Sequence, residues 1–267
     1  MKENSNSAKR RVKIRGAKEL AENLTESSLE RPMAPNPIKK QIKLNQFPWT
    51  EKQKEFFKVA LDPFTKIVFV NGPAGTAKTL LSVYCSLQLL NMKVSSDIMY
   101  LRSAVESSDK SLGYLPGDAN EKLRFYNLPF LDKLDELLVE TRAERLEEQK
   151  RISMFPVNFA RGMNWKHKCI ILDEAQNSSE KEIITVLTRM GEGCRCFILA
   201  DPMQTDLKNE NKQGGCEELA EIFSDEESAS EGVYSFCFTE EDVMRSELVK
   251  FLIKKINNAS KSKKRSK

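Results

Sequence analysis

The chain of 267 residues is 40% hydrophobic and 31% charged, which is ordinary for a globular protein of one large domain or two small ones. It lacks the ~18 consecutive apolar residues that a transmembrane helix needs, so no such helix is expected. The basic N-terminus is not followed by an apolar stretch, and we therefore expect no secretory signal.

The net charge of +4 conceals opposite charges in different parts of the chain. Residues 1–45 hold 11 Lys and Arg against 5 Asp and Glu, whereas residues 250–267 hold 8 Lys and Arg and no acid. Such basic ends suit contacts with the phosphates of RNA or DNA, and they suit solubility alone equally well. We expect a disordered basic arm at 1–44, a folded domain at 45–255 and a basic tail at 256–267.

The six cysteines and the single histidine, His167, give little basis for a metal site. No two cysteines have the CxxC spacing that is typical of structural zinc sites. Cysteines inside apolar runs act as small hydrophobic side chains when they are reduced. We expect no structural metal and a reducing, cytoplasmic compartment.

Residues 45–57, NQFPWTEKQKEFF, lie just before the first predicted strand. A glutamine amide can pair with the N6 and N7 groups of adenine, which makes Gln53 a candidate for reading the base. Phe47 or Trp49 would then stack on it. The alternative is that Gln53 belongs to the polar face of a helix whose apolar residues are core.

A strand at 66–70, the loop NGPAGTAKT at 71–79 and an apolar helix after it form one predicted unit. A glycine-rich turn in this context lets backbone N–H groups converge on phosphate oxygens. Lys78 would pair with the β- and γ-phosphates of ATP, and the Thr79 hydroxyl would bind Mg²⁺. The expected nucleotide-binding residues of the loop are Gly72, Pro73, Ala74, Gly75, Thr76, Ala77, Lys78, Thr79 and Leu80.

The loop departs from the usual phosphate-binding pattern at Ala77, where a second glycine is expected. A Cβ is costly at this position only if the backbone adopts a positive φ. Because position 77 adjoins the helix, and alanine favours helix, we expect a right-handed φ there. The sequence therefore predicts a working loop with altered packing.

Further short apolar runs at 97–101, 168–172, 195–200 and 233–238 predict buried strands, and helical patterns separate them. This alternation predicts an α/β fold with a mostly parallel sheet and helices on both faces. The charged stretch 121–150 predicts a helical insertion with an apolar stripe of leucines at 131, 134, 138 and 137. It either packs on the sheet domain or serves a partner subunit or substrate.

The strand at 168–172 runs into two adjacent carboxylates, Asp173 and Glu174. Asp173 would hold Mg²⁺ through water, and Glu174 would orient and activate a water on the γ-phosphate. The next strand is followed by ILADPMQTD, in which Gln204 can both donate and accept hydrogen bonds near that water. A second carboxylate suits hydrolysis, because water is then the nucleophile.

Taken together these residues resemble the PhoH-like ATPases, which are related to the core of superfamily 1 helicases. The resemblance runs from about residue 45 to about residue 255. The motifs that carry it are QKEFF, NGPAGTAKT, LRSAVESSDKSLGYLPGD, FARGMNW, IILDEAQNSS, LTRMG, ADPMQTDL and EEDVMRSELV. It implies a RecA-like P-loop fold, ATP and Mg²⁺ as cofactors, and a bacterial or phage origin.

The resemblance also implies ATP hydrolysis linked to RNA or DNA remodelling. Arg245 matches a family arginine that would stabilise the γ-phosphate charge, whereas Arg102, Arg161 and Arg189 fall in family motifs without a firm role. One ATPase domain lacks the second domain that completes a helicase site, so we expect a homo-oligomeric ring, a hexamer, with Arg245 one candidate to act across the interface. Two alternatives remain: a switch protein with slow hydrolysis, and a small-molecule kinase.

Overall fold

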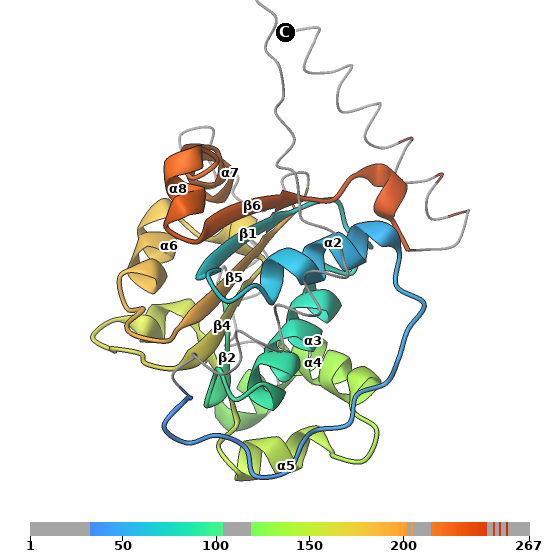
Figure 1. The fold of residues 1–267 in the computed structure, drawn as a ribbon, viewed down its shortest axis with the longest axis vertical. Coiled ribbons are helices and arrows are strands. Elements are labelled where there is room, and N and C mark those ends of the chain that lie inside the picture. The colour runs from blue at the N-terminus through green and yellow to red at the C-terminus, as the bar shows by residue number, and fades with distance from the viewer. Residues whose placement is uncertain are drawn as a thin grey trace, which may run out of the picture. The chain divides into compact units, whose positions relative to one another are not determined.

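The computed structural model describes residues 33–103, 119–201, 204, 215–244, 248, 251 and 255, with backbone alone at 119–126. Its centre is a six-stranded, fully parallel sheet in the order β3-β2-β4-β5-β1-β6 (Figure 1). The strands are β1 Ile67–Asn71, β2 Asp97–Arg102, β3 Ile152–Pro156, β4 Lys168–Asp173, β5 Arg195–Ala200 and β6 Val233–Cys237. The predicted α/β fold with a parallel sheet is confirmed.

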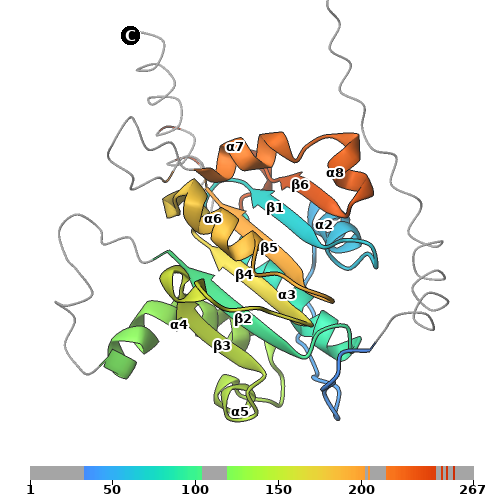
Figure 2. The same cartoon turned by 90° about the vertical axis from the view of Figure 1, so that its left-hand side faces the viewer.

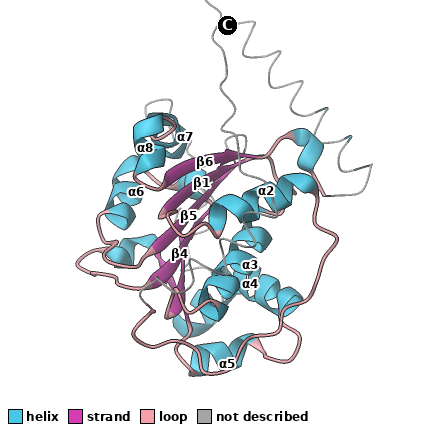
Figure 3. Cartoon of the chain, viewed as in Figure 1, coloured by secondary structure: helices cyan, strands magenta, loops and turns pink. Residues whose placement is uncertain are grey.

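Helices cover both faces of this sheet (Figures 2 and 3). On one face lie α2 Glu51–Ala60, α3 Lys78–Asn91, α4 Ala119–Leu137 and α5 Ala143–Glu148. On the other face lie α6 Glu180–Leu187 and α7 Gly215–Ile222, and α8 Glu226–Ser230 leads into β6. Short 3₁₀ helices are η3 Val157–Ala160, η4 Ala175–Asn177 and η5 Glu240–Asp242.

Alternation along the strands divides the apolar residues between two cores. In β1, Val68 and Val70 point to the core under α2, α3 and α4, whereas Phe69 points to the core under α6 and α7. All three are fully buried, as expected for a parallel strand with helices on both sides. The carboxyl ends of β1, β4 and β5 therefore meet along one edge, where a ligand can reach all three.

All five strands that the sequence predicts are present, and β3 is an additional one that it does not predict. Residues 152–156, ISMFP, mix polar and apolar types and form a half-buried edge, so they lack the continuous apolar run of an inner strand. The strand at the other edge, β6, is predicted as buried but is largely half-exposed or exposed. An edge strand has one neighbour and less cover than the sequence pattern suggests.

The predicted helical stretch 121–150 forms two helices, α4 and α5, and it packs on the sheet domain. Its leucine stripe is buried, with Leu134 and Leu137 at 0% exposure. Phe130 stacks on Tyr100 of β2 with ring centroids 4.6 Å apart. Residues 33–44, assigned from sequence to the N-terminal arm, add Ile38 and Ile42 to the same core.

Candidate nucleotide-binding site

The loop between β1 and α3 wraps around its own lysine. Gly72 lies so close to Phe238 that an added Cβ would come within 2.7 Å of the phenylalanine Cβ. Gly75 has a φ of 87°, which favours glycine. The Lys78 Nζ donates hydrogen bonds to the carbonyl oxygens of Gly72 at 2.6 Å and Pro73 at 3.1 Å. The lysine therefore lies along the concave side of the loop.

The backbone at Ala77 is left-handed, with φ 63° and ψ 23°, so the sequence-based expectation of a right-handed φ is wrong. Ala77 is the residue before the first helical residue of α3, and its side chain makes no cap hydrogen bond. Helix propensity, on which the expectation rested, applies only from Lys78 onward. An L-residue in this conformation costs about 1–2 kcal/mol, so the loop keeps a local strain that glycine would relieve.

Asp173, the last residue of β4, accepts hydrogen bonds from three directions. The Tyr100 hydroxyl donates to its Oδ2 at 2.9 Å, the Thr79 hydroxyl at 3.1 Å, and the Glu174 backbone N–H donates to its Oδ1 at 3.0 Å. Burial raises the pKa of Asp173, and the neighbouring charge of Glu174 adds to the rise. Carboxylate and hydroxyl oxygens at this spacing are hard donors that fit Mg²⁺.

Glu174 is held by a residue that the sequence analysis did not single out. The Gln176 side-chain N–H₂ donates to the Glu174 carboxylate at 2.6 Å, and its Oε1 accepts from the Asp201 backbone N–H at 3.0 Å. Arg102, at the end of β2, forms an ion pair with the other Glu174 oxygen at 3.9 Å. Gln176 thus ties the carboxylate to the end of β5, and the Q of the sequence DEAQ was the available signal.

Lys78 adds a second positive charge, besides Arg102, near the acidic strand ends. Burial lowers its pKa, while the charges of Asp201, Asp173 and Glu174 act in the opposite direction. Asp201 follows β5 and is 5% exposed. The ammonium group is thus partly desolvated and held by two backbone carbonyls, and its positive charge suits it to polyanionic phosphate.

Gln53 and two aromatic residues form the other end of the site. Gln53 is 3% exposed, and its Oε1 accepts from the Thr50 backbone N–H at 3.0 Å in a capping box that starts α2. The Trp49 ring packs on Phe47, Phe57 and Tyr84, with centroids 5.0 to 5.2 Å apart across this cluster. The structural role of Gln53 is thus visible, and its pairing with adenine stays a prediction.

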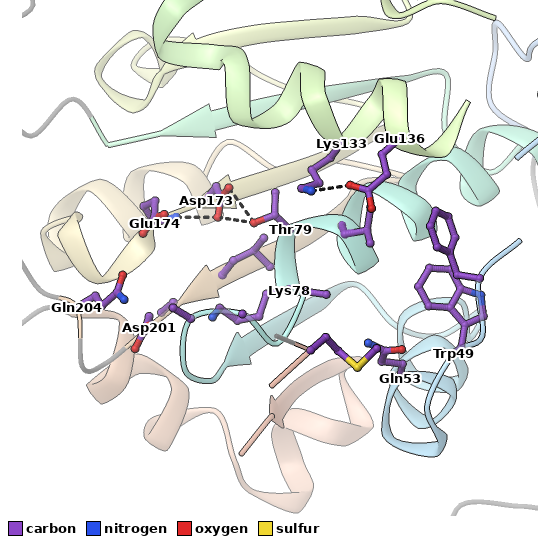
Figure 4. A pocket seen from close by; sticks show the side chains of 18 of the residues that line it. Trp49, Gln53, Lys78, Thr79, Lys133, Glu136, Asp173, Glu174, Asp201 and Gln204 are labelled. Atoms are coloured by element: carbon purple, nitrogen blue, oxygen red, sulfur yellow. Dashed lines mark hydrogen bonds and ion pairs between the residues drawn. The ribbon is translucent and has the colours of Figure 1, made fainter. Parts of the chain in front are cut away.

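One cavity of about 530 Å³ joins both ends (Figure 4). Helix α4 supplies Lys133 and Glu136 to its wall, which the sequence analysis did not anticipate. Met244 also lines it, and its backbone N–H donates to the Gly75 carbonyl at 2.8 Å. Predicted site residues that line the cavity are Gln53, Ala74, Gly75, Ala77, Lys78, Thr79, Leu80, Asp173, Glu174 and Gln204.

The remaining predicted residues have other places. Gly72, Pro73 and Thr76 shape the loop from behind, with the Thr76 hydroxyl donating to the Pro73 carbonyl at 2.9 Å. Gln204 is exposed at the margin of the cavity. Arg161 and Arg189 are not among the lining residues. Arg245 lies outside the described residues.

Comparison with known proteins identifies the family of the chain. The family described as PhoH-like protein matches residues 47–257. The chain belongs to this family. A PhoH-like protein of Synechocystis sp. is 34% identical over 188 residues, covering 70% of this chain and 55% of the relative. A PhoH-like protein of Bacillus subtilis is 36% identical over 189 residues, covering 71% and 57%.

This PhoH-like chain spans about half the length of the curated relatives that it matches. Among solved structures, one of Pif1 helicases on forked dsDNA aligns with a TM-score of 0.31 and 15% identity, over 72% of this chain and 44% of that one. The family and the phosphate loop together make the chain a P-loop NTPase in fold. Within the described residues, no helix is long and apolar enough to cross a membrane.

Proposed function

We propose that this PhoH-like protein binds ATP with Mg²⁺ and hydrolyses it. The observation that carries the proposal is the orientation of the Glu174 carboxylate, which Gln176 and Arg102 hold from two sides beside the phosphate loop. A carboxylate fixed in this way can accept a proton from an attacking water. Gln204, at the margin of the same cavity, can contact that water or the γ-phosphate.

The residues of the loop would bind the triphosphate. Backbone N–H groups at the start of α3 and the Lys78 ammonium would contact the phosphate oxygens. Asp173 and Thr79 would hold Mg²⁺, which neutralises phosphate charge when it is bound. A kinase is the weaker alternative, because Glu174 and Gln204 suit water as the acceptor of the phosphoryl group.

Phosphate release by wild type and Glu174→Gln tests the proposal. Loss of the general base should reduce turnover about 10²–10⁴-fold, while ATP affinity measured by equilibrium binding stays within a few-fold. The exposed Glu192, changed to Gln, is the control and should leave turnover unchanged. Equal turnover in Glu174→Gln would remove Glu174 from the mechanism. Wild type that binds ATP without measurable turnover would favour the switch protein.

We propose further that hydrolysis is coupled to single-stranded RNA or DNA within a ring of subunits. The basic segments 1–45 and 250–267 support contact with phosphates, and family membership is consistent with it. Either polymer should raise phosphate release, and added salt should weaken that effect. Sedimentation showing a monomer that hydrolyses ATP at full rate would contradict the ring, including its hexameric form.

A further inference from the structure

We propose that Glu136 of α4 recognises the ribose hydroxyls of the bound nucleotide, with Lys133 as its partner, and that this pair selects ribonucleotides over deoxyribonucleotides. The inference rests on the proposed binding of ATP in this cavity. It adds a subsite built by a helix that carries none of the recognised motifs.

The position of Glu136 follows from the two fixed ends of the cavity. Phosphates belong at Lys78 and Thr79, and a base belongs beside Trp49 and Gln53. The sugar of any nucleotide lies between its base and its α-phosphate. Glu136 lines the cavity, and in Figure 4 it lies beyond Thr79 on the side toward Trp49, with Lys133 nearer to Thr79 and Asp173.

The end of α4 is fastened to the segment that carries the aromatic residues. The Asn45 backbone N–H donates to the Leu137 carbonyl at 2.8 Å, and the Asn45 side-chain amide donates to the Glu136 carbonyl at 2.8 Å. Val139 N–H donates to the Lys43 carbonyl at 3.2 Å. Segment 43–49 and the end of α4 are therefore hydrogen-bonded to each other, and both supply residues to the lining of the cavity.

The chemistry of the pair fits a sugar. The Lys133 ammonium donates to the Glu136 Oε2 at 2.6 Å. A carboxylate offers about four acceptor sites, so capacity remains for two hydroxyl donors. An unpaired carboxylate at this place would be repelled by the phosphates. The positive charge of Lys133 reduces that repulsion.

The expected discrimination is moderate because both side chains keep access to water. Their exposed fractions are 37% for Lys133 and 39% for Glu136. A buried site that binds a hydroxyl rejects the analogue lacking it by about 10⁴-fold or more, whereas here water can replace the missing hydroxyl. We expect about a 10-fold preference for ATP over 2′-deoxy-ATP or 3′-deoxy-ATP.

Equilibrium binding of ATP, 2′-deoxy-ATP and 3′-deoxy-ATP with Mg²⁺ tests the inference. In Glu136→Ala the preference for ATP should disappear. Glu140→Ala is the matched control, because Glu140 follows the same helix, pairs with Lys43 and does not line the cavity. Glu136→Gln, which keeps the shape, should lose part of the preference and guards against a folding defect.

Changing Lys133 separates charge balance from packing. Lys133→Ala should weaken binding of all three nucleotides, and Lys133→Ala with Glu136→Ala should restore part of that loss. Equal affinity of wild type for all three nucleotides, or an unchanged preference in Glu136→Ala, would overturn the inference while leaving ATP binding intact. Wild type that binds none of them would instead overturn the proposed function, and this inference with it.

Discussion

The two ends of the cavity are built in different ways. At the phosphate end, residues 71–79 and the ends of β4 and β5 bring together a desolvated lysine, buried carboxylates and two left-handed residues, Ala77 and Glu174. At the outer end, aromatic rings and α4 pack on the main core with little exposed apolar surface in Leu134 or Phe130. Backbone strain and buried charged groups are therefore concentrated at the first end, whereas the second end is built mainly from packed apolar side chains.

The two ends are expected to differ in what they contribute to the stability of the fold and to ligand binding. Burial of Lys78 and Asp173 disfavours their charged forms in the folded protein, so these groups add little to the free energy of unfolding. Burial of the α4 leucines, by contrast, contributes directly to the free energy of unfolding. Substitutions at the phosphate end should therefore change binding and turnover, whereas substitutions in the α4 core should change stability.

The largest effect on binding is expected for Lys78→Ala. Loss of a partly desolvated charge that would contact phosphate should cost about 2–5 kcal/mol of ATP binding. The free energy of unfolding should change little, because burial lowers the pKa of Lys78 and so disfavours its charged form in the folded protein. Isothermal titration measures the loss of ATP binding, and urea unfolding measures the change in the free energy of unfolding. A large loss of stability without loss of ATP affinity would contradict the expectation that the phosphate end contributes to binding and not to stability.

Leu134→Ala should give the opposite pattern. Its side chain is fully buried under the sheet, so the deletion should cost about 2–5 kcal/mol of unfolding free energy. Leu128 on the same helix is 40% exposed, and Leu128→Ala should cost less than about 1 kcal/mol. At a temperature where both variants are folded, ATP affinity should stay within a few-fold of wild type. Equal destabilisation by the two changes would show that α4 does not pack as described.

Gln176→Leu changes the phosphate end at a residue that is not expected to contact phosphate. Removing the amide leaves the Glu174 carboxylate and the Asp201 N–H without this partner, which should raise the activation free energy by about 1–3 kcal/mol. Because Gln176 acts through Glu174, kcat should fall while KM changes little, and Gln176→Asn should recover part of the rate. The exposed Gln149, changed to Leu, is the control. A rise in KM alone would place Gln176 in substrate binding instead.

The sequence predicted the phosphate end better than the outer end for a physical reason. Loop residues 71–79 and the pair Asp173–Glu174 lie in short contiguous motifs next to strands, and parallel topology brings such strand ends together. Glu136 and Trp49 line one cavity only because α4 packs back on α3 and segment 43–49 is hydrogen-bonded to the end of α4, and no local sequence pattern records that arrangement. The strand β3 was missed for a similar reason, since an edge strand has a weak apolar pattern.

The left-handed backbone of Ala77 was the other feature that the sequence did not predict. Its substitution is expected to have the smallest effect of those considered. Ala77→Gly relieves a left-handed alanine worth about 1–2 kcal/mol, but glycine gains conformational freedom in the unfolded chain worth about 0.4–1 kcal/mol. The net expectation is a stabilisation of about 0.5–1 kcal/mol, measured by urea unfolding.

Ala74→Gly is the matched control, because Ala74 lies in the same loop and is not among the described residues with positive φ. It has no strain to relieve, so only the entropic term remains and this variant should lose about 0.4–1 kcal/mol. Changes of opposite sign in the free energy of unfolding at these two alanines, three positions apart, would locate the strain at residue 77. The same sign at both would mean that the left-handed turn is absent, and that helix propensity was the right guide to Ala77 after all.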